Sequence, residues 1–309
     1  MEKIYCWACD ISKNTGEGNL AHIFLKNLGT NYNICIFDLQ KLNVTNSFLF
    51  KIFSYKYISP FVGLIFCWFF FFQKKKVSYI NYLPLWNCIL FIFLPPQTIL
   101  GPITGGANFK NNNKLFVRKY IFPLLYKISE IFINFRLKRI NFSTDLLKPF
   151  LKKSTIAKSN FNYIFNLVNK KKKNVKDIDF LIYYRKHKNK ESFFPYNFIK
   201  KLISLNFKVH IIGDYLNFSS VTNYGYIDNK LVNIILSKTF YTLASNENLY
   251  SLFTIESINN HVKIIVDKNQ FKKIKFFKKN FICLDFNKIY NINSLKIIKL
   301  TINNPIIHH

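Results

Sequence analysis

The chain has 309 residues, half of them apolar and 18% aromatic, which excludes a disordered protein and leaves room for two domains. Its 45 basic and 15 acidic residues give a formal charge of +30, yet only four of the basic residues are arginines. Arginine makes the bidentate contacts with which proteins read nucleic acids, so the composition argues against a nucleic-acid partner. A phosphorylated ligand and an anionic membrane surface remain compatible with the charge.

The six cysteines lie in apolar surroundings, as expected of reduced thiols in a cytoplasmic protein. Cys6 and Cys9 form a C-x-x-C motif inside the predicted strand Ile4–Ile11. Positions three apart on a strand point to opposite faces, which disfavours a shared metal or a redox pair. We therefore interpret both as core residues and predict no metal site.

A βαβ unit is predicted at the start of the chain, with strands at Ile4–Ile11 and Asn33–Asp38 around a helix at Asn19–Leu28. We expect no signal peptide before the first strand. The loop before the helix contains Gly16 and Gly18, a G-x-G pattern that suits a ligand-facing turn but lacks the third glycine of the dinucleotide fingerprint. A plain tight turn is the equal alternative.

The uncharged residues 58–72 are the candidate membrane segment of the chain. A membrane span needs about 20 apolar residues, and this shorter run contains Pro60 and Gly63. We expect a buried or interfacial helix over Pro60–Phe72.

The rest of the first half alternates further strands and helices and contains a Gly/Pro loop at 101–106. A loop of this kind after a buried strand places backbone amides at the ligand-binding edge of a parallel sheet, which suggests Thr104 and Gly105 as acceptor-side residues. A structural turn is again the equal alternative. Strands are predicted at Lys76–Tyr82, Thr98–Leu100 and Arg139–Phe142, and helices at Leu85–Leu94 and Leu115–Leu137.

The second half begins after a lysine-rich linker within Asn160–Lys176. Its strands are nearly continuous apolar runs, which is typical of a parallel sheet covered on both faces. Strands are predicted at Asp179–Tyr184, Lys208–Ile212, Thr239–Ala244 and Val262–Val266, and helices at Tyr196–Leu205, Asn229–Leu236 and Leu249–Asn259. The sequence thus predicts an α/β protein of two doubly wound, Rossmann-like domains facing a cleft.

Two clusters in the second half carry chemistry. Basic residues at 185–190 follow the first strand of this half, where cations suit a diphosphate. Polar residues at 245–248 follow the strand Thr239–Ala244 and precede a helix that carries Glu256. A helix N-terminus at this position offers N–H groups to a phosphate, and a carboxylate in the helix can hold a ribose. Each cluster alone could be an ordinary solvated loop.

Together these motifs resemble the C-terminal half of retaining GT-B glycosyltransferases of family 4. In that family an arginine and a lysine five positions apart bind the donor diphosphate, and Arg185 and Lys190 have this spacing. The stretch ending in Gly213-Asp214 resembles the next family strand, and Tyr224–Ile227 resembles the strand that precedes the donor motif.

The family's donor motif is a pair of glutamates separated by seven residues. Glu256 matches the second glutamate, which binds the ribose in the family. The first glutamate falls at Asn248, one residue after Glu247, and the glycine-rich span of the family is replaced by residues that include Tyr250 and Ser251. The resemblance implies that these residues contact the donor, although the sugar-binding half of the motif is altered.

The resemblance implies a glycosyltransferase that moves a sugar from a nucleotide-diphosphate donor to a glycan or lipid-linked acceptor in cell-surface polysaccharide synthesis. We predict a hexosyl-type, retaining and metal-independent enzyme without a cofactor, located in the cytoplasm or peripherally on the inner face of the membrane. The alternatives are a degenerate, non-catalytic GT-B interaction protein and a nucleotide-sugar epimerase. The predicted parts are an acceptor domain at 1–165, a donor domain at 176–285 and a C-terminal segment at 286–309.

Overall fold

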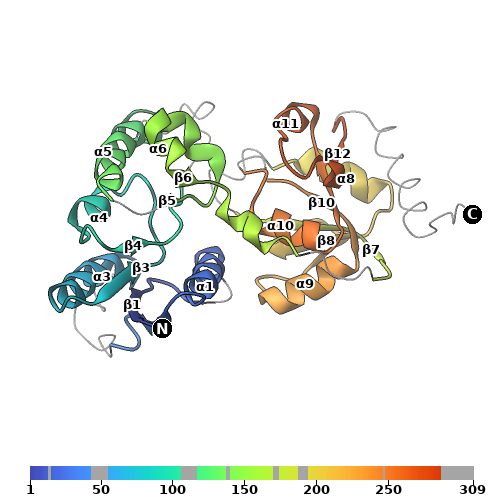
Figure 1. The fold of residues 1–309 in the computed structure, drawn as a ribbon. Helices are drawn as coiled ribbons and strands as arrows, with labels where there is room; N and C mark the ends of the chain where they lie inside the picture. The colour runs from blue at the N-terminus through green and yellow to red at the C-terminus, as the bar shows by residue number, and fades with distance from the viewer. Residues whose placement is uncertain are drawn as a thin grey trace, which may run out of the picture. The chain divides into compact units, whose positions relative to one another are not determined.

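The computed structural model describes residues 1–12, 15–42, 55–105, 117–136, 140–169, 174–186, 194–245 and 248–286 (Figure 1). The chain divides into two compact units, with the boundary between Asn166 and Leu167. Each unit is an α/β structure built on a parallel sheet. The predicted fold class, α/β with two doubly wound Rossmann-like domains, is confirmed.

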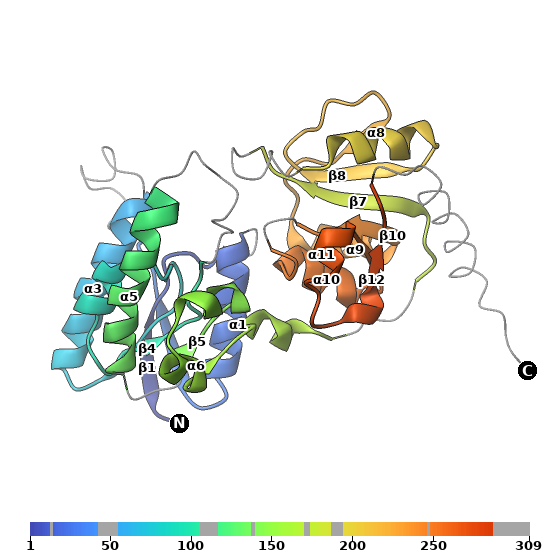
Figure 2. The ribbon, with the colours of Figure 1, turned by 90° about the horizontal axis from the view of Figure 1, so that it is seen from above.

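The first unit holds a sheet of four parallel strands, β1 (Lys3–Trp7), β2 (Asn33–Phe37), β3 (Lys76–Tyr79) and β4 (Ile99–Leu100). Their order is β2-β1-β3-β4, so the chain reverses its direction across the sheet between β2 and β3. As a result α1 (Gly16–Leu28) and α3 (Tyr55–Phe72) cover opposite faces (Figure 2).

Shorter elements complete the first unit. Single bridges join Pro84 to Thr104 and Ile103 to Phe142, which extends the parallel pairing beyond β4. The remaining elements are α4 (Cys88–Phe93), the π-helical turn η2 (Val117–Ile121), α5 (Phe122–Asn134), β5 (Ile140–Asn141), η3 (Asp145–Phe150), α6 (Lys153–Ala157), β6 (Ser159–Asn160) and η4 (Tyr163–Leu167).

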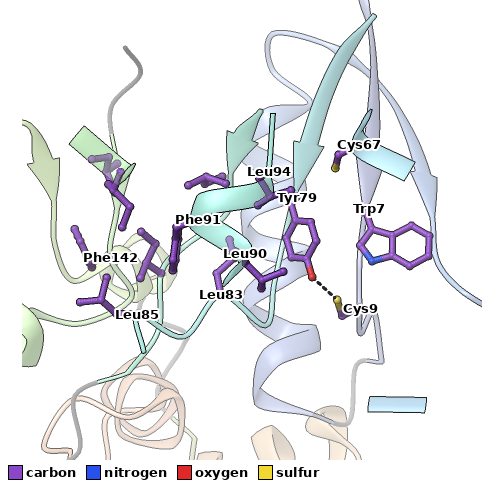
Figure 3. Close-up of a cluster of buried hydrophobic side chains, with 14 of the residues drawn as sticks. Trp7, Cys9, Cys67, Tyr79, Leu83, Leu85, Leu90, Phe91, Leu94 and Phe142 are labelled. Carbon is purple, nitrogen blue, oxygen red and sulfur yellow. Dashed lines mark hydrogen bonds between the residues drawn. The ribbon is translucent and has the colours of Figure 1, made fainter. Parts of the chain in front are cut away.

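The core of the first unit lies between the sheet and its helices, and aromatic side chains fill much of it (Figure 3). Trp7 is fully buried and its indole Nε1 donates to the backbone oxygen of Ser59 at 3.1 Å. Tyr79 is also fully buried, and its hydroxyl is hydrogen-bonded to the Cys9 sulfur at 3.2 Å. The polar atoms of both aromatic residues thus have partners, as burial in a dry core requires.

Cys6 and Cys9 are both buried and unpaired with one another, which confirms their interpretation as core residues. Burial raises the pKa of the Cys6 thiol to about 12. Within the described part of the chain, no three His, Cys, Asp or Glu side chains come together as metal ligands. In the same residues, every helix is too short or too polar to cross a membrane, including α3.

The second unit has a six-stranded, fully parallel sheet in the order β12-β11-β10-β7-β8-β9. Its chain reverses direction across the sheet between β9 and β10, as in the doubly wound Rossmann fold. The strands are β7 (Ile178–Tyr184), β8 (Val209–Gly213), β9 (Val221–Asn223), β10 (Thr239–Leu243), β11 (Lys263–Val266) and β12 (Phe281–Cys283). The helices are α8 (Tyr196–Ser204), α9 (Asn229–Ser237), α10 (Leu252–Asn259), α11 (Lys268–Phe271) and the 3-10 turn η5 (Lys278–Asn280).

Local sequence explains where these elements begin. Asp228 accepts a hydrogen bond from the Leu231 amide at 2.7 Å and so caps α9. Ser251 caps α10 in the same way by accepting from the Thr254 amide at 3.2 Å, so this helix starts three residues later than predicted. Strands β7 and β10 are buried along almost their whole length because helices cover both faces of the sheet.

Two predicted strands are corrected, and two further elements of the second unit were not predicted. The first strand ends at Trp7 rather than Ile11, because the chain turns there to reach the capping residue Thr15. The strand expected at Tyr224–Ile227 lies earlier in the chain, because β9 spans Val221–Asn223 and its pairing with β8 ends at Asn223. Strand β12 and the short helix α11 were not predicted; the lysines around them hide the apolar pattern.

Candidate functional site

The two predicted donor clusters follow the two strands that flank the topological switch point of the second unit. Strands β7 and β10 are neighbours in the sheet, yet the chain moves away from them in opposite directions. In open α/β sheets, ligands bind outside the carboxyl ends of the strands at such a point. The basic segment at 185–190 begins at the end of β7, and the polar segment at 245–248 begins after β10. This common edge is the candidate donor site.

Aromatic contacts join the end of β7 to the start of α8. The Tyr184 hydroxyl lies 2.9 Å from that of Tyr196, the first residue of α8. The ring of Tyr184 also packs on that of Phe194, with 4.6 Å between centroids. Arg185 follows directly and is exposed, so its guanidinium is available to an anion. Lys190 lies outside the described residues.

The end of β8 supports the same segment. The Asp214 amide donates to the Tyr184 oxygen at 3.0 Å, and its carboxylate accepts from the Lys186 amide at 2.6 Å. Gly213 precedes it at φ +100°, and a Cβ atom there would lie 2.2 Å from the Tyr184 oxygen. Only glycine therefore permits this close approach of β8 to the end of β7.

Tyr226 belongs to the same group of side chains. Burial and then the Asp214 carboxylate raise the pKa of the Tyr226 phenol, whereas Arg185 acts in the opposite direction. Asp214 and Tyr226 were not among the predicted site residues. The Gly-acidic pattern after β8 was the signal for Asp214, and Tyr226 lies in the stretch Tyr224–Ile227 that resembles a family strand.

On the β10 side, local hydrogen bonds occupy several of the predicted donor residues. The Asn248 side-chain oxygen accepts from the Tyr250 amide at 3.1 Å, and Ser251 caps α10. The buried Tyr250 hydroxyl accepts from the Lys275 and Phe276 amides at 3.0 and 2.8 Å. Tyr250 therefore anchors this loop from within the unit, and Glu247 lies outside the described residues.

Helix α10 reaches back toward β7. The ring of Phe253, in its first turn, packs against Tyr183 with centroids 5.9 Å apart. Glu256 follows three residues later, so it lies on the same side of the helix and is half-buried. The structure thus brings the α10 N-terminus and the end of β7 together, with Glu256 one turn further along.

The predicted acceptor-side residues fall at the carboxyl edge of the first sheet, but not as one loop. Gly16 and Gly18 form the first turn of α1, since Thr15 caps the helix by accepting from the Gly18 amide at 3.0 Å. Thr104 continues the sheet through hydrogen bonds with Leu83 and Leu85. β3 lies between these two places. The glycines were predicted to lie before the helix, and this prediction was wrong.

Residues that sequence reasoning missed organise the switch point of the first sheet. Asn81, after β3, is fully buried and accepts from the amides of Cys9 and Asp10 at 2.9 and 3.3 Å. The Asp10 carboxylate accepts from the Thr15 hydroxyl at 2.6 Å. Burial is the main cause that raises the pKa of the Tyr82 phenol to about 12, and the negative charge of Asp10 is the second. No motif marked these residues; only the strand order places them together.

Comparisons with known proteins concern the fold. No family model matches the chain, and no curated protein matches it. One similar solved structure, from Listeria monocytogenes, is assigned as a UDP-N-acetylglucosamine 2-epimerase. It is 10% identical in sequence, with a TM-score of 0.49, and the match covers 98% of this chain and 89% of that chain.

Two further solved structures are similar over 98% of the chain. The UDP-GlcNAc 2-epimerase of Methanocaldococcus jannaschii, in complex with UDP-GlcNAc and UDP, is 12% identical in sequence with a TM-score of 0.46. The match covers 93% of that chain. The Escherichia coli heptosyltransferase WaaC with ADP is 8% identical with a TM-score of 0.42 and is covered to 100%.

Proposed function

We propose that the protein is a nucleotide-sugar glycosyltransferase of the GT-B type whose donor binds at the carboxyl ends of β7 and β10. One observation supports this most strongly. The Arg185 segment and the α10 N-terminus, which were selected from the sequence for diphosphate chemistry, follow the two strands at the switch point of a Rossmann-type sheet. That position binds nucleotides in open α/β sheets.

The proposed reaction transfers a hexose with retention of configuration. The bond between the anomeric carbon and the diphosphate oxygen breaks, the acceptor oxygen bonds to the anomeric carbon on the same face, and the acceptor proton passes to the leaving diphosphate. Arg185, Lys190 and the α10 N–H groups would stabilise the charge that develops on the leaving diphosphate. These groups supply positive charge without a metal ion, so the proposal is metal-independent. Glu256 would accept hydrogen bonds from the ribose.

The acceptor would bind at the carboxyl edge of the first sheet. The Asp10 and Tyr82 side chains lie there, close to the first turn of α1. Hydroxyl and carboxylate groups of this kind suit a glycan or the head of a lipid-linked acceptor, in keeping with a role in polysaccharide synthesis.

One observation favours a second candidate, a nucleotide-sugar-binding protein without turnover. Asn248 stands where the family has its first glutamate, and its side-chain oxygen is used by the Tyr250 amide. An amide cannot supply the negative charge that favours a developing oxocarbenium ion.

A turnover assay separates these functions. The purified protein would be incubated with nucleotide sugars, with and without a lipid extract as acceptor, and released nucleoside diphosphate would be measured. Acceptor-dependent release supports the transferase. Binding without release indicates the second candidate, and isomerisation of the donor indicates an epimerase.

Substitution at Glu256 tests the donor site within that assay. Glu256→Gln keeps the shape of the side chain but weakens its hydrogen bonds to ribose hydroxyls, since bonds to a charged partner are about twice as strong. We expect a higher donor KM and a lower kcat, by about tenfold in kcat/KM. Glu2→Gln is the control and should change neither parameter.

The neighbouring positions form a second arm of the same test. If Asn248 replaces the missing glutamate, Asn248→Ala lowers kcat/KM and Glu247→Ala has a mild effect. The reverse order shows that the motif has shifted by one residue. If all these variants match the wild type, the donor assignment on this side of the site is wrong.

A further inference from the structure

The first unit carries a set of exposed apolar side chains on α3, α4 and α5. Most of the exposed large apolar residues among the described parts of the chain belong to this unit. We name six of them the apolar helical face: Ile65, Phe69 and Phe72 of α3, Phe93 of α4, and Leu124 and Phe135 on or beside α5. Ile65, Phe72 and Phe135 are each more than 70% exposed, at 71%, 76% and 75%.

These helices form a fixed layer. α4 packs against both α3 and α5 (Figure 1). The Trp68 indole donates to the Phe93 oxygen at 2.7 Å and joins α3 to α4. The buried Arg136 guanidinium donates to the oxygens of Leu94 and Pro95 at 3.0 and 2.7 Å and joins the end of α5 to the end of α4. The apolar helical face is therefore presented by a rigid support rather than by loops.

The exposed apolar residues of α3 recur at helical spacing, so they lie along one side of the helix. On α3, Phe61, Ile65 and Phe69 are four residues apart and occupy one side of the helix, while Phe66 and Cys67 are buried against the sheet. Apolar patches of this kind on a soluble surface mark interaction sites.

The charges around the apolar helical face are positive and favour an anionic partner. Lys74 and Lys75 follow Phe72, and Lys127 lies on the exposed side of α5. The three helices contain a single acidic residue, Glu130, which is buried and accepts from the Lys152 amide at 2.6 Å. A second copy of this chain would bring lysines against lysines, whereas an anionic lipid surface offers both opposite charge and an apolar interior.

We propose that the apolar helical face is a membrane-docking surface that inserts its aromatic side chains into the interface of an anionic bilayer. The lysines contact lipid phosphates, and the helices lie parallel to the bilayer without crossing it. This inference rests on the first unit alone and does not depend on the proposed donor site.

Vesicle flotation of the full chain tests the proposal. We expect binding to vesicles of phosphatidylcholine mixed with phosphatidylglycerol, but not to phosphatidylcholine alone. Phe69→Ser combined with Phe72→Ser should lower the partition coefficient by about tenfold or more. The matched control, Leu231→Ser with Ile234→Ser, removes two exposed apolar side chains from α9 and should leave it unchanged.

Two matched charge-reversal variants test the contribution of the lysines beside the apolar helical face. Lys127→Glu should lower binding by about fivefold or more, and Lys230→Glu on α9, which changes the net charge equally, should not. The proposal is overturned if the variants and their controls behave alike, or if anionic vesicles bind no protein. It is also overturned if Phe69→Ser with Phe72→Ser abolishes a dimer instead, or if binding withstands high salt and alkaline extraction, which would indicate an inserted segment.

Discussion

Gly213→Ala will destabilise the protein by about 2–5 kcal/mol, because the new Cβ meets a backbone atom rather than a movable side chain. Gly213 has φ +100°, and a Cβ atom added to it would lie 2.2 Å from the Tyr184 oxygen. The strand ends of β7 and β8 must separate to relieve this contact, which breaks the hydrogen bond from the Asp214 amide to the same oxygen. Urea denaturation measures the loss in the free energy of unfolding.

Gly29→Ala is the matched control. Gly29 follows α1 at φ −66°, where any residue is allowed, and a Cβ atom there would lie 3.3 Å from both the flexible end of Ile34 and the Leu25 oxygen, which is much less crowded than at Gly213. We expect a change within about 1 kcal/mol, in either direction. Equal losses for both variants would contradict the close approach of β8 to β7. Since Asp214 also holds the Lys186 amide, Gly213→Ala should weaken donor binding as well.

Arg185→Ala has the largest expected effect on ligand binding. A hydrogen bond to a charged group contributes about 1.5–3 kcal/mol, so the variant should bind a nucleoside diphosphate roughly 10- to 150-fold more weakly. Arg185 is exposed and lies beyond the end of β7, so stability should be preserved. Isothermal titration calorimetry gives the affinity, and the urea midpoint verifies the fold.

Two comparisons separate a specific contact from general electrostatics. Lys190→Ala should weaken binding to a similar degree. Lys230→Ala removes an exposed charge from α9 and should have no measurable effect. If Arg185→Ala and Lys230→Ala weaken binding alike, the net charge of the chain and not the proposed site attracts the ligand.

Most of the strands and helices of the second unit could be predicted because their signals are local. β7 is a continuous apolar run, and α9 starts at an aspartate that caps it. The order of the strands could not be read from the sequence, since it depends on contacts between distant segments. This order is what places the end of β7 beside that of β10.

Part of the candidate site was selected from the sequence for the same reason. The position of Arg185 after a strand and the match of Glu256 to the family motif selected these two residues, and their contact with a donor stays a prediction. Asp10, Asn81 and Tyr82 were missed because they come from two separate strand ends and match no motif. Asn248 shows that a position in a motif does not by itself predict what a side chain contacts. Its position suggests sugar binding, whereas its side-chain oxygen accepts a hydrogen bond from the Tyr250 amide in a local turn.

Titration of the wild-type protein with a panel of nucleoside diphosphates and the matching nucleosides tests the donor site most directly. We expect saturable binding of at least one diphosphate, much weaker binding of its nucleoside, and loss of the difference in Arg185→Ala. Such a result would show that the diphosphate is recognised at the end of β7. Failure of every diphosphate to bind, or identical affinities for the wild type and Arg185→Ala, would contradict the proposed donor site.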